Sequence, residues 1–112
     1  MSQRCVVVAL IRPREGQIGA VREHLQAVIP AVHEESGCEF YALHEGTDDT
    51  LVFVEAWDSR EQWLQHMEGP AVREITERLE GLLAVPTEVH EVYGVPVGEP
   101  EKGLIPTATA SR

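Results

Sequence analysis

The sequence has few positive charges and no long apolar run. Nine Lys and Arg residues stand against nineteen Asp and Glu residues, for a formal net charge of −10. Nucleic acids and anionic membranes bind through cationic patches, so this balance excludes both as expected partners. No apolar stretch approaches the roughly 18–20 residues that cross a bilayer, and the N-terminal residues do not read as a signal peptide. We therefore expect a cytoplasmic protein.

Cofactor and metal motifs are absent as well. Two cysteines, Cys5 and Cys38, are too few for a disulfide framework or, alone, for a zinc site. The sequence contains no glycine-rich phosphate loop after a strand and no HExxH, GxSxG or EF-hand pattern. The five histidines show no metal-ligand spacing. We expect no cofactor, no metal, and two buried free thiols.

Hydrophobic periodicity divides the chain into elements in the order β-α-β-β-α(α)-β. Strands are expected at 5–11, 38–45, 51–57 and 87–93, and helices at 16–35, 59–68 and 70–83. This order predicts an α+β, ferredoxin-like βαββαβ fold, with a four-stranded antiparallel sheet and helices on one face. One domain is expected over residues 1–94, followed by an irregular C-terminal tail, 95–112, that could dock through Leu104 and Ile105.

Local signals mark the helix ends. Ser59 followed three residues later by Gln62 forms a capping box. Pro70 suits the first position of the third helix, and Gly37 suits the stop of the first. Pro30 lies inside the first helix and is expected to kink it or loosen its last turn.

Two strands, CVVVALI and LVFVEAW, are apolar at nearly every position and so on both faces. The helices can cover only one face of the sheet. The other would expose an apolar patch of several hundred Å², which monomers rarely tolerate. The strands therefore predict a homodimer in which two sheets pack face to face.

Glu55 is a carboxylate in the middle of an apolar strand, where its burial costs free energy unless it is paired. It is either half solvated or paired to an arginine, or it is a pocket carboxylate with a raised pKa that orients a neighbour. Trp57 and Phe53 share its face of the strand. Trp57 is either core packing or the wall of a pocket for a planar ligand, and Tyr41 in the preceding strand offers the same two interpretations.

His66 is the histidine of most interest. It follows Trp63 by three residues, so the two share one face of a short helix. Histidine titrates near neutral pH and can accept a proton from a phenol or an enol. The alternative is that His66 caps the helix end before the Gly-Pro break.

Two stretches resemble motifs of one family. Glu35-Ser36-Gly37-Cys38 followed by Tyr41 is similar to its entry to the second strand, and Val54-Glu55-Ala56-Trp57-Asp58-Ser59 followed by His66 is similar to its third strand and next helix. The family is the antibiotic biosynthesis monooxygenase (ABM) domain of the dimeric α+β barrel superfamily. The resemblance spans about residues 4–93.

The resemblance implies a ferredoxin-like homodimer that oxidises small hydrophobic anthrones or quinols with O2 and without flavin, haem or metal. It implies His66 as the acid/base group, Glu55 as the orienting carboxylate, and pocket walls that include Trp57 and Tyr41. With their face-sharing neighbours, the substrate-binding set becomes Trp57, Tyr41, Phe53 and Trp63. A haem-degrading branch of the same fold uses an Asn-Trp-His triad, and this sequence has Ala9, His66 and Thr76 near those positions, which disfavours haem degradation.

Three functions remain open. The first is a cofactor-independent monooxygenase of an aromatic quinol or anthrone. The second is an isomerase of a small carbonyl compound that uses His66 and Glu55. The third is a non-catalytic ligand-binding or stress-response dimer, in which the same residues are structural.

Overall fold

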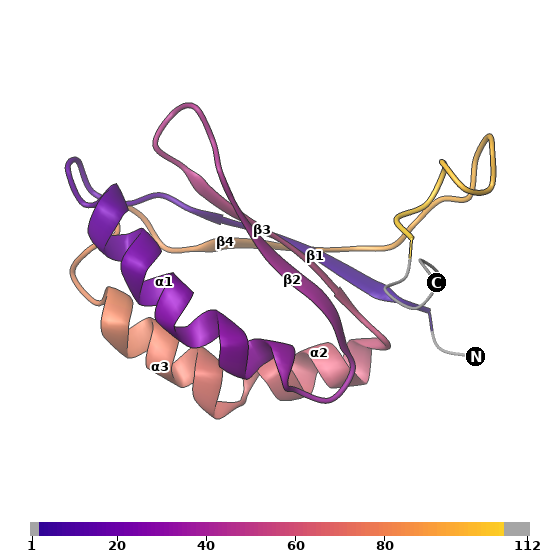
Figure 1. Ribbon diagram of the computed structural model, residues 1–112, viewed down its shortest axis with the longest axis horizontal. Coiled ribbons are helices and arrows are strands. Elements are labelled where there is room, and N and C mark those ends of the chain that lie inside the picture. Colours follow the sequence, from indigo (N-terminus) through magenta and orange to yellow (C-terminus); the bar gives the residue numbers. More distant parts are fainter. Residues whose placement is uncertain (1–2, 107–112) are drawn as a thin grey trace.

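The computed structural model describes residues 3–106 and confirms the ferredoxin-like α+β fold. The elements are β1 (Cys5–Ile11), α1 (Ile18–His33), β2 (Cys38–Glu45), β3 (Leu51–Trp57), α2 (Arg60–Met67), α3 (Pro70–Leu79) and β4 (Glu88–Val92). The four strands form an antiparallel sheet in the order β2-β3-β1-β4. All three helices lie on one side of it (Figure 1).

The helix α1 presents one apolar stripe to the sheet. Its fully buried residues recur at intervals of three and four, as its sequence predicts: Val21, Leu25, Val28 and Val32. The helix runs through the exposed Pro30 to His33, so the proline does not end it. Gly37 then turns the chain with φ +83°, a left-handed conformation that favours glycine.

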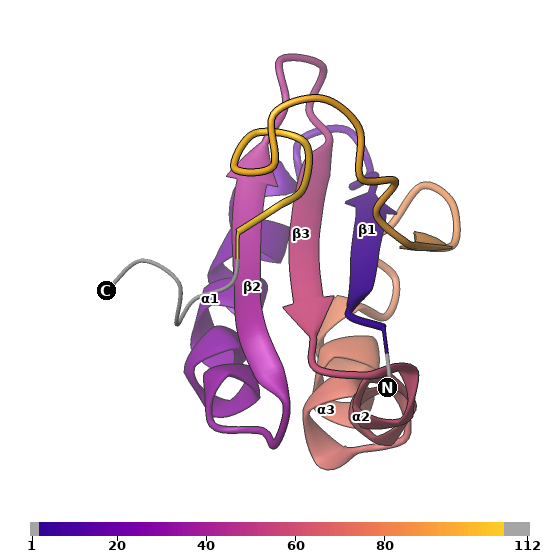
Figure 2. The ribbon, with the colours of Figure 1, turned by 90° about the vertical axis from the view of Figure 1, so that its right-hand side faces the viewer.

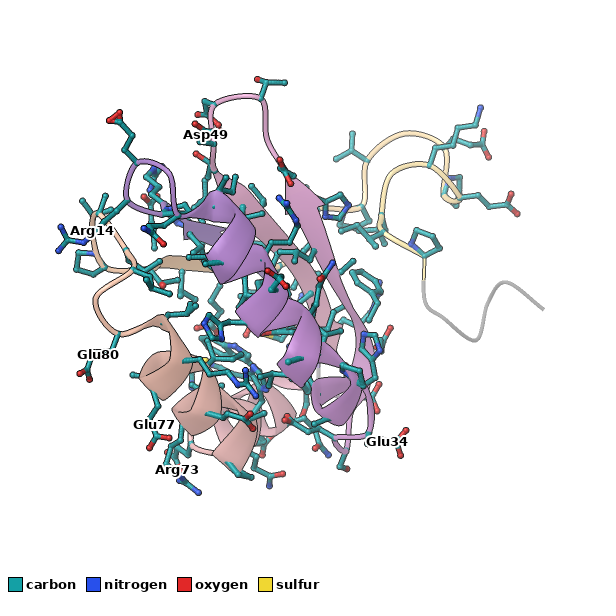
Figure 3. The ribbon with its side chains drawn as sticks, turned by 60° about the vertical axis from the view of Figure 1, so that its left-hand side comes forward. Arg14, Glu34, Asp49, Arg73, Glu77 and Glu80 are labelled. Atoms are coloured by element: carbon teal, nitrogen blue, oxygen red, sulfur yellow. The ribbon has the colours of Figure 1, made fainter. Side chains whose placement is uncertain are left out.

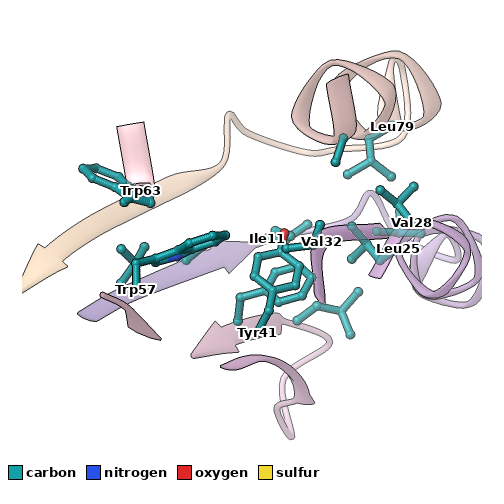
Figure 4. Packing of buried hydrophobic residues seen from close by; sticks show 14 of the residues in the cluster. Ile11, Leu25, Val28, Val32, Tyr41, Trp57, Trp63 and Leu79 are labelled. Carbon is teal, nitrogen blue, oxygen red and sulfur yellow. The ribbon is translucent and has the colours of Figure 1, made fainter. Parts of the chain in front are cut away.

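The core lies between the helices and the inner face of the sheet (Figure 4). Strand register sets this face: Val7 pairs with Glu55 and Ala9 with Phe53 across β1 and β3. Tyr41 of β2 pairs with Glu55 from the other side. Figure 4 shows Tyr41 between Trp57 on one side and Leu25 and Val28 of α1 on the other. Glu55 is thus built into the buried face and not into a solvated edge.

The strand β4 differs from its prediction. It spans Glu88–Val92 instead of 87–93, and four of its five residues are exposed in place of the expected half-buried alternation. The physical reason is its position at the sheet edge, beyond the area that α1 covers.

The opposite, outer face of the sheet carries the C-terminal tail. Figure 2 shows this segment passing in front of the strands, with the helices behind them. Residues 95–106 contain no helix or strand, and residues 107–112 of the expected tail lie outside the described part of the chain. Arg4 holds the tail: its guanidinium donates to the carbonyls of Ile105 and Pro106. The division into a domain over 1–94 and a tail over 95–112 stays a prediction.

The surface carries many charged side chains. Several charged side chains point away from the body of the molecule (Figure 3): Arg14, Glu34, Asp49, Arg73, Glu77 and Glu80. Among the described helices, none is long and apolar enough to cross a membrane.

Candidate functional site

The buried carboxylate Glu55 is paired with the indole of Trp57. Both residues lie on the inner face of β3, two positions apart, and the Trp57 Nε1–H donates to Glu55 Oε1 over 3.0 Å. The Glu55 residue is 4% exposed and Trp57 is fully buried. The partner that was left open by the sequence is therefore an indole, not an arginine.

His66 packs onto this pair from α2. Ser59 caps the helix by accepting a hydrogen bond from the Gln62 amide at 3.3 Å, which fixes where α2 begins. Two turns later the His66 imidazole stacks on the Trp57 ring at a centroid distance of 4.6 Å, and Tyr41 meets it edge-on at 5.5 Å. The structure thus brings together four sequence-predicted residues: Glu55, Trp57, Tyr41 and His66.

Glu35 completes the cluster, and sequence reasoning did not select it. It follows α1 in the turn before β2, and its Oε1 accepts a hydrogen bond from His66 Nδ1 at 2.8 Å. The pair joins residues 31 positions apart, which no periodicity detects. The available signal was the Glu35-to-Tyr41 motif of the resemblance, in which this glutamate comes first.

Burial perturbs the ionisable groups of this cluster. Desolvation raises the pKa of Glu55 to about 7, with the Trp57 hydrogen bond opposing that rise and the nearby Glu35 charge adding to it. Desolvation also lowers the pKa of His66, against the stabilising hydrogen bond and charge of Glu35. Burial raises the pKa of Tyr41, which keeps its phenol protonated. At neutral pH the imidazole is therefore mostly neutral and able to accept a proton.

A cleft of about 330 Å³ opens beside His66, between α1, α2 and α3. Its lining combines the Glu35–His66 pair with small and polar residues: Ala31, Ser36, Gln62, Gln65, Gly69, Pro70, Ala71 and Glu74. Of the residues expected at the site, His66 alone lines the cleft.

The aromatic residues expected to bind substrate lie deeper. Tyr41 stacks on Phe53 at 4.3 Å, and both belong to the packed core together with Trp57 and Trp63. Figure 4 shows Trp63 on the α2 side and Trp57 on the sheet side of one aromatic layer. Trp57 and Tyr41 of this layer contact the His66 imidazole.

Two buried polar atoms on α2 have no hydrogen-bond partner among the described residues: Gln62 Oε1 and Trp63 Nε1. The capping box is accordingly half formed. The Gln62 backbone amide binds Ser59, but its side chain packs over Gly37, where a Cβ atom would lie 2.5 Å from Gln62 Cγ. A buried acceptor left unpaired in this way costs about 1–3 kcal/mol.

Other features offer less chemistry. A larger cavity, of about 860 Å³, lies under the tail beside Arg4, Val6 and Leu104, away from the Glu35–His66 pair. Within residues 3–106, no group of three metal-binding side chains could hold an ion. Cys5 and Cys38 are both free; Cys5 is buried as expected, whereas Cys38 is only partly buried.

Comparisons with known proteins bear on the family and the fold of the chain. The family model described as antibiotic biosynthesis monooxygenase matches residues 4–78. A protein of Escherichia coli K12 named "Probable quinol monooxygenase YgiN" is 29% identical over 87 residues, covering 67% of this chain and 84% of that protein. The structure of Rv0793 from Mycobacterium tuberculosis is 30% identical, with a TM-score of 0.76 over 87% of this chain and 98% of that one. PA3566 from Pseudomonas aeruginosa, at 22% identity and a TM-score of 0.76 over 85% of this chain and 97% of that one, shares the fold.

Proposed function

Because the chain belongs to the antibiotic biosynthesis monooxygenase family, we propose that it is a cofactor-independent monooxygenase that oxidises an aromatic quinol or anthrone-like substrate with O2. The observation that carries this proposal is the cleft beside His66, whose neutral imidazole is held by Glu35. The name of the Escherichia coli relative supports a quinol as the substrate class.

In the proposed mechanism, His66 is the general base. Its Nδ1–H donates to Glu35, so Nε2 is the nitrogen that accepts a phenolic proton. The Glu35 carboxylate stabilises the imidazolium that forms. The resulting quinolate or enolate is electron-rich enough to transfer an electron directly to O2, and the protein contributes orientation and exclusion of water.

The substrate supplies every electron in this scheme. A quinol loses two hydrogens and gains one oxygen atom to become a hydroxyquinone, and the second oxygen atom leaves as water with those two hydrogens. No external reductant is needed, and the scheme uses no flavin, haem or metal. His66 returns its proton when the oxygen intermediate loses water.

Glu55 and the aromatic residues act on the base in this proposal. Trp57 stacks on the imidazole and Glu55 holds the Trp57 indole by its Nε1–H. Tyr41 meets the ring edge, while Phe53 and Trp63 fill the layer around it. Direct contact of these aromatic residues with substrate stays a prediction, since none of them lines the cleft.

The test is oxygen uptake by metal-free protein with a panel of methylhydroquinone, larger quinols and anthrone. We expect uptake above the buffer rate that falls at least about 100-fold in His66→Ala, the usual scale for loss of a general base. His90→Ala, a change at an exposed histidine on β4, should leave the rate unchanged. Equal rates in wild type and His66→Ala would reject this role of His66.

The polar lining of the cleft favours one alternative, an isomerase of a small carbonyl compound. A neutral imidazole paired with a carboxylate can remove a proton next to a carbonyl and return it to another atom. Oxygen consumption distinguishes the two functions, because a monooxygenase consumes O2 and an isomerase does not. In deuterium oxide, an isomerase would instead exchange the substrate proton for deuterium.

We also propose that the outer face of the sheet, where the C-terminal tail leaves it uncovered, is the interface of a homodimer. Its central side chains, Val8 of β1 and Val54 of β3, remain only half buried although they are apolar. We expect a dimer at micromolar concentration in analytical ultracentrifugation. Val54→Lys should shift it to monomer, whereas Val85→Lys, at an exposed loop residue outside the four strands, should not.

A further inference from the structure

The cleft beside His66 has a one-sided charge. Two carboxylates line it, Glu35 and Glu74, whereas no Lys or Arg does. The whole chain adds to this field with a net charge of −10. Arg78 Nε binds Glu74 Oε2 at 2.8 Å and offsets part of this charge, but Arg78 itself does not line the cleft.

The lining is also rich in hydrogen-bond acceptors. Besides the two carboxylates, Ser36, Gln62 and Gln65 border the cleft, and each carries a side-chain oxygen that can accept a hydrogen bond. A ligand that brings hydroxyl donors would satisfy such groups, and a ligand that brings a carboxylate would add further acceptors and a like charge.

One helix end favours an anion in the cleft and so acts against the two carboxylates. The N-terminus of α3 reaches the cleft through Gly69, Pro70 and Ala71, and a helix N-terminus attracts anions with the equivalent of about half a positive charge. Pro70 has no N–H, and the Gly69 N–H already donates to the His66 carbonyl at 3.0 Å. The carboxylates of Glu35 and Glu74 oppose the attraction of this helix end for an anion.

We propose that the cleft selects its ligand by charge: it accepts a neutral aromatic diol and rejects the same molecule carrying a carboxylate, with Glu74 as the residue that sets this selectivity. This inference rests on the proposed function only in taking the cleft as the substrate site. It concerns binding, and therefore can be tested without oxidation.

The test compares two probes that differ in one charge: 2,5-dihydroxyphenylacetate and its methyl ester. Their dissociation constants are measured by calorimetry without oxygen, so that neither probe is consumed. We expect the wild type to bind the ester about tenfold more tightly than the acid, the scale of one like-charge contact at a partly solvated site. The ratio should shrink at high salt, because Glu74 is half exposed.

Variants of α3 identify the residue. Glu74→Gln should lower the ratio of the dissociation constant of the acid to that of the ester about threefold, and Glu74→Lys should lower it about tenfold or more. The same two substitutions at Glu77, which is exposed on α3 but does not line the cleft, should leave the ratio within about twofold. These controls match the change in net charge.

The outcomes are distinct from those of the proposed function. Selective binding without oxygen uptake would reject the monooxygenase and support the charge selectivity. Oxygen uptake with equal binding of acid and ester would support the monooxygenase and overturn the selectivity. Failure of both probes to bind, or equal effects of the Glu74 and Glu77 variants, would also overturn it.

Discussion

The buried carboxyl of Glu55 should make the stability of the protein depend on pH. Its pKa is 4.5 when solvated and about 7 in the folded protein, so the folded state binds this proton more tightly. The stabilisation from proton binding is present below the unfolded pKa and is lost as pH rises through the folded one. A tenfold change in proton affinity corresponds to about 1.4 kcal/mol, so the loss totals about 3.5 kcal/mol, of which about 2.5 kcal/mol falls between about pH 5 and 8.

The assay is urea unfolding of wild type and Glu55→Gln across this pH range. Glutamine cannot titrate, yet its side-chain oxygen can still accept the Trp57 indole hydrogen bond. Relative to the variant, wild type should lose about 2.5 kcal/mol between about pH 5 and 8, while the contributions of other groups cancel in the difference. Glu61→Gln, at an exposed position of α2, is the control and should show a constant difference. A wild type that tracks Glu55→Gln to within about 0.5 kcal/mol over this range would mean that the carboxyl is solvated, and the argument from burial would fail.

Three further predictions follow from single contacts. Glu35→Gln should move the acid limb of the kcat/KM profile to lower pH. In the wild type the Glu35 carboxylate stabilises the protonated His66 imidazole, so its removal lowers the pKa of His66. Gly37→Ala should cost about 1–3 kcal/mol more free energy of unfolding than Gly16→Ala, since both have positive φ but only the former places a Cβ against a side chain. Arg4→Gln should raise the rate of cleavage by a lysine-specific protease severalfold, because Arg4 holds the tail carbonyls just after Lys102, the single lysine of the chain.

Each of these has its control measurement. If the acid limb of the kcat/KM profile stays at the same pH or moves to higher pH in Glu35→Gln, then Glu35 does not stabilise the protonated form of the catalytic base. Equal unfolding free energies for the two glycine variants would show that the Gly37 turn has room for a methyl group. For the tail, Arg14→Gln removes an exposed arginine far from it, and the same cleavage rate in both arginine variants would show that Arg4 does not hold the segment.

The sequence predicted the strands closely because local chemistry determines them. β1 and β3 are rich in β-branched residues and end before Arg12-Pro13 and Asp58-Ser59, while β2 lies between Gly37 and Gly46, and the bounds of all three match those expected. The helix starts at Ser59 and Pro70 follow from capping and from the fixed φ of proline in the same way. Strand β4 was less accurate, since the exposure of an edge strand depends on what lies beside it.

The site was only half predictable. Face-sharing along one strand placed Glu55 next to Trp57, and the helical spacing placed His66 toward the core. The contact between His66 and Glu35 is long-range and polar, so neither periodicity nor composition could reveal it. The position of the Gln62 side chain likewise depends on the space above Gly37, which exists only once the turn and α2 are packed together.

The two carboxylates of the cluster divide its charge between them. Glu35 is bonded to the imidazole and partly exposed, whereas Glu55 is buried and bonded to a neutral indole. The charge of Glu35 adds to the burial that raises the pKa of Glu55, so near neutral pH an ionised Glu35 favours a protonated Glu55. The buried carboxyl can therefore support the stack without competing with Glu35 for the imidazolium, provided that it keeps its proton while His66 gains one.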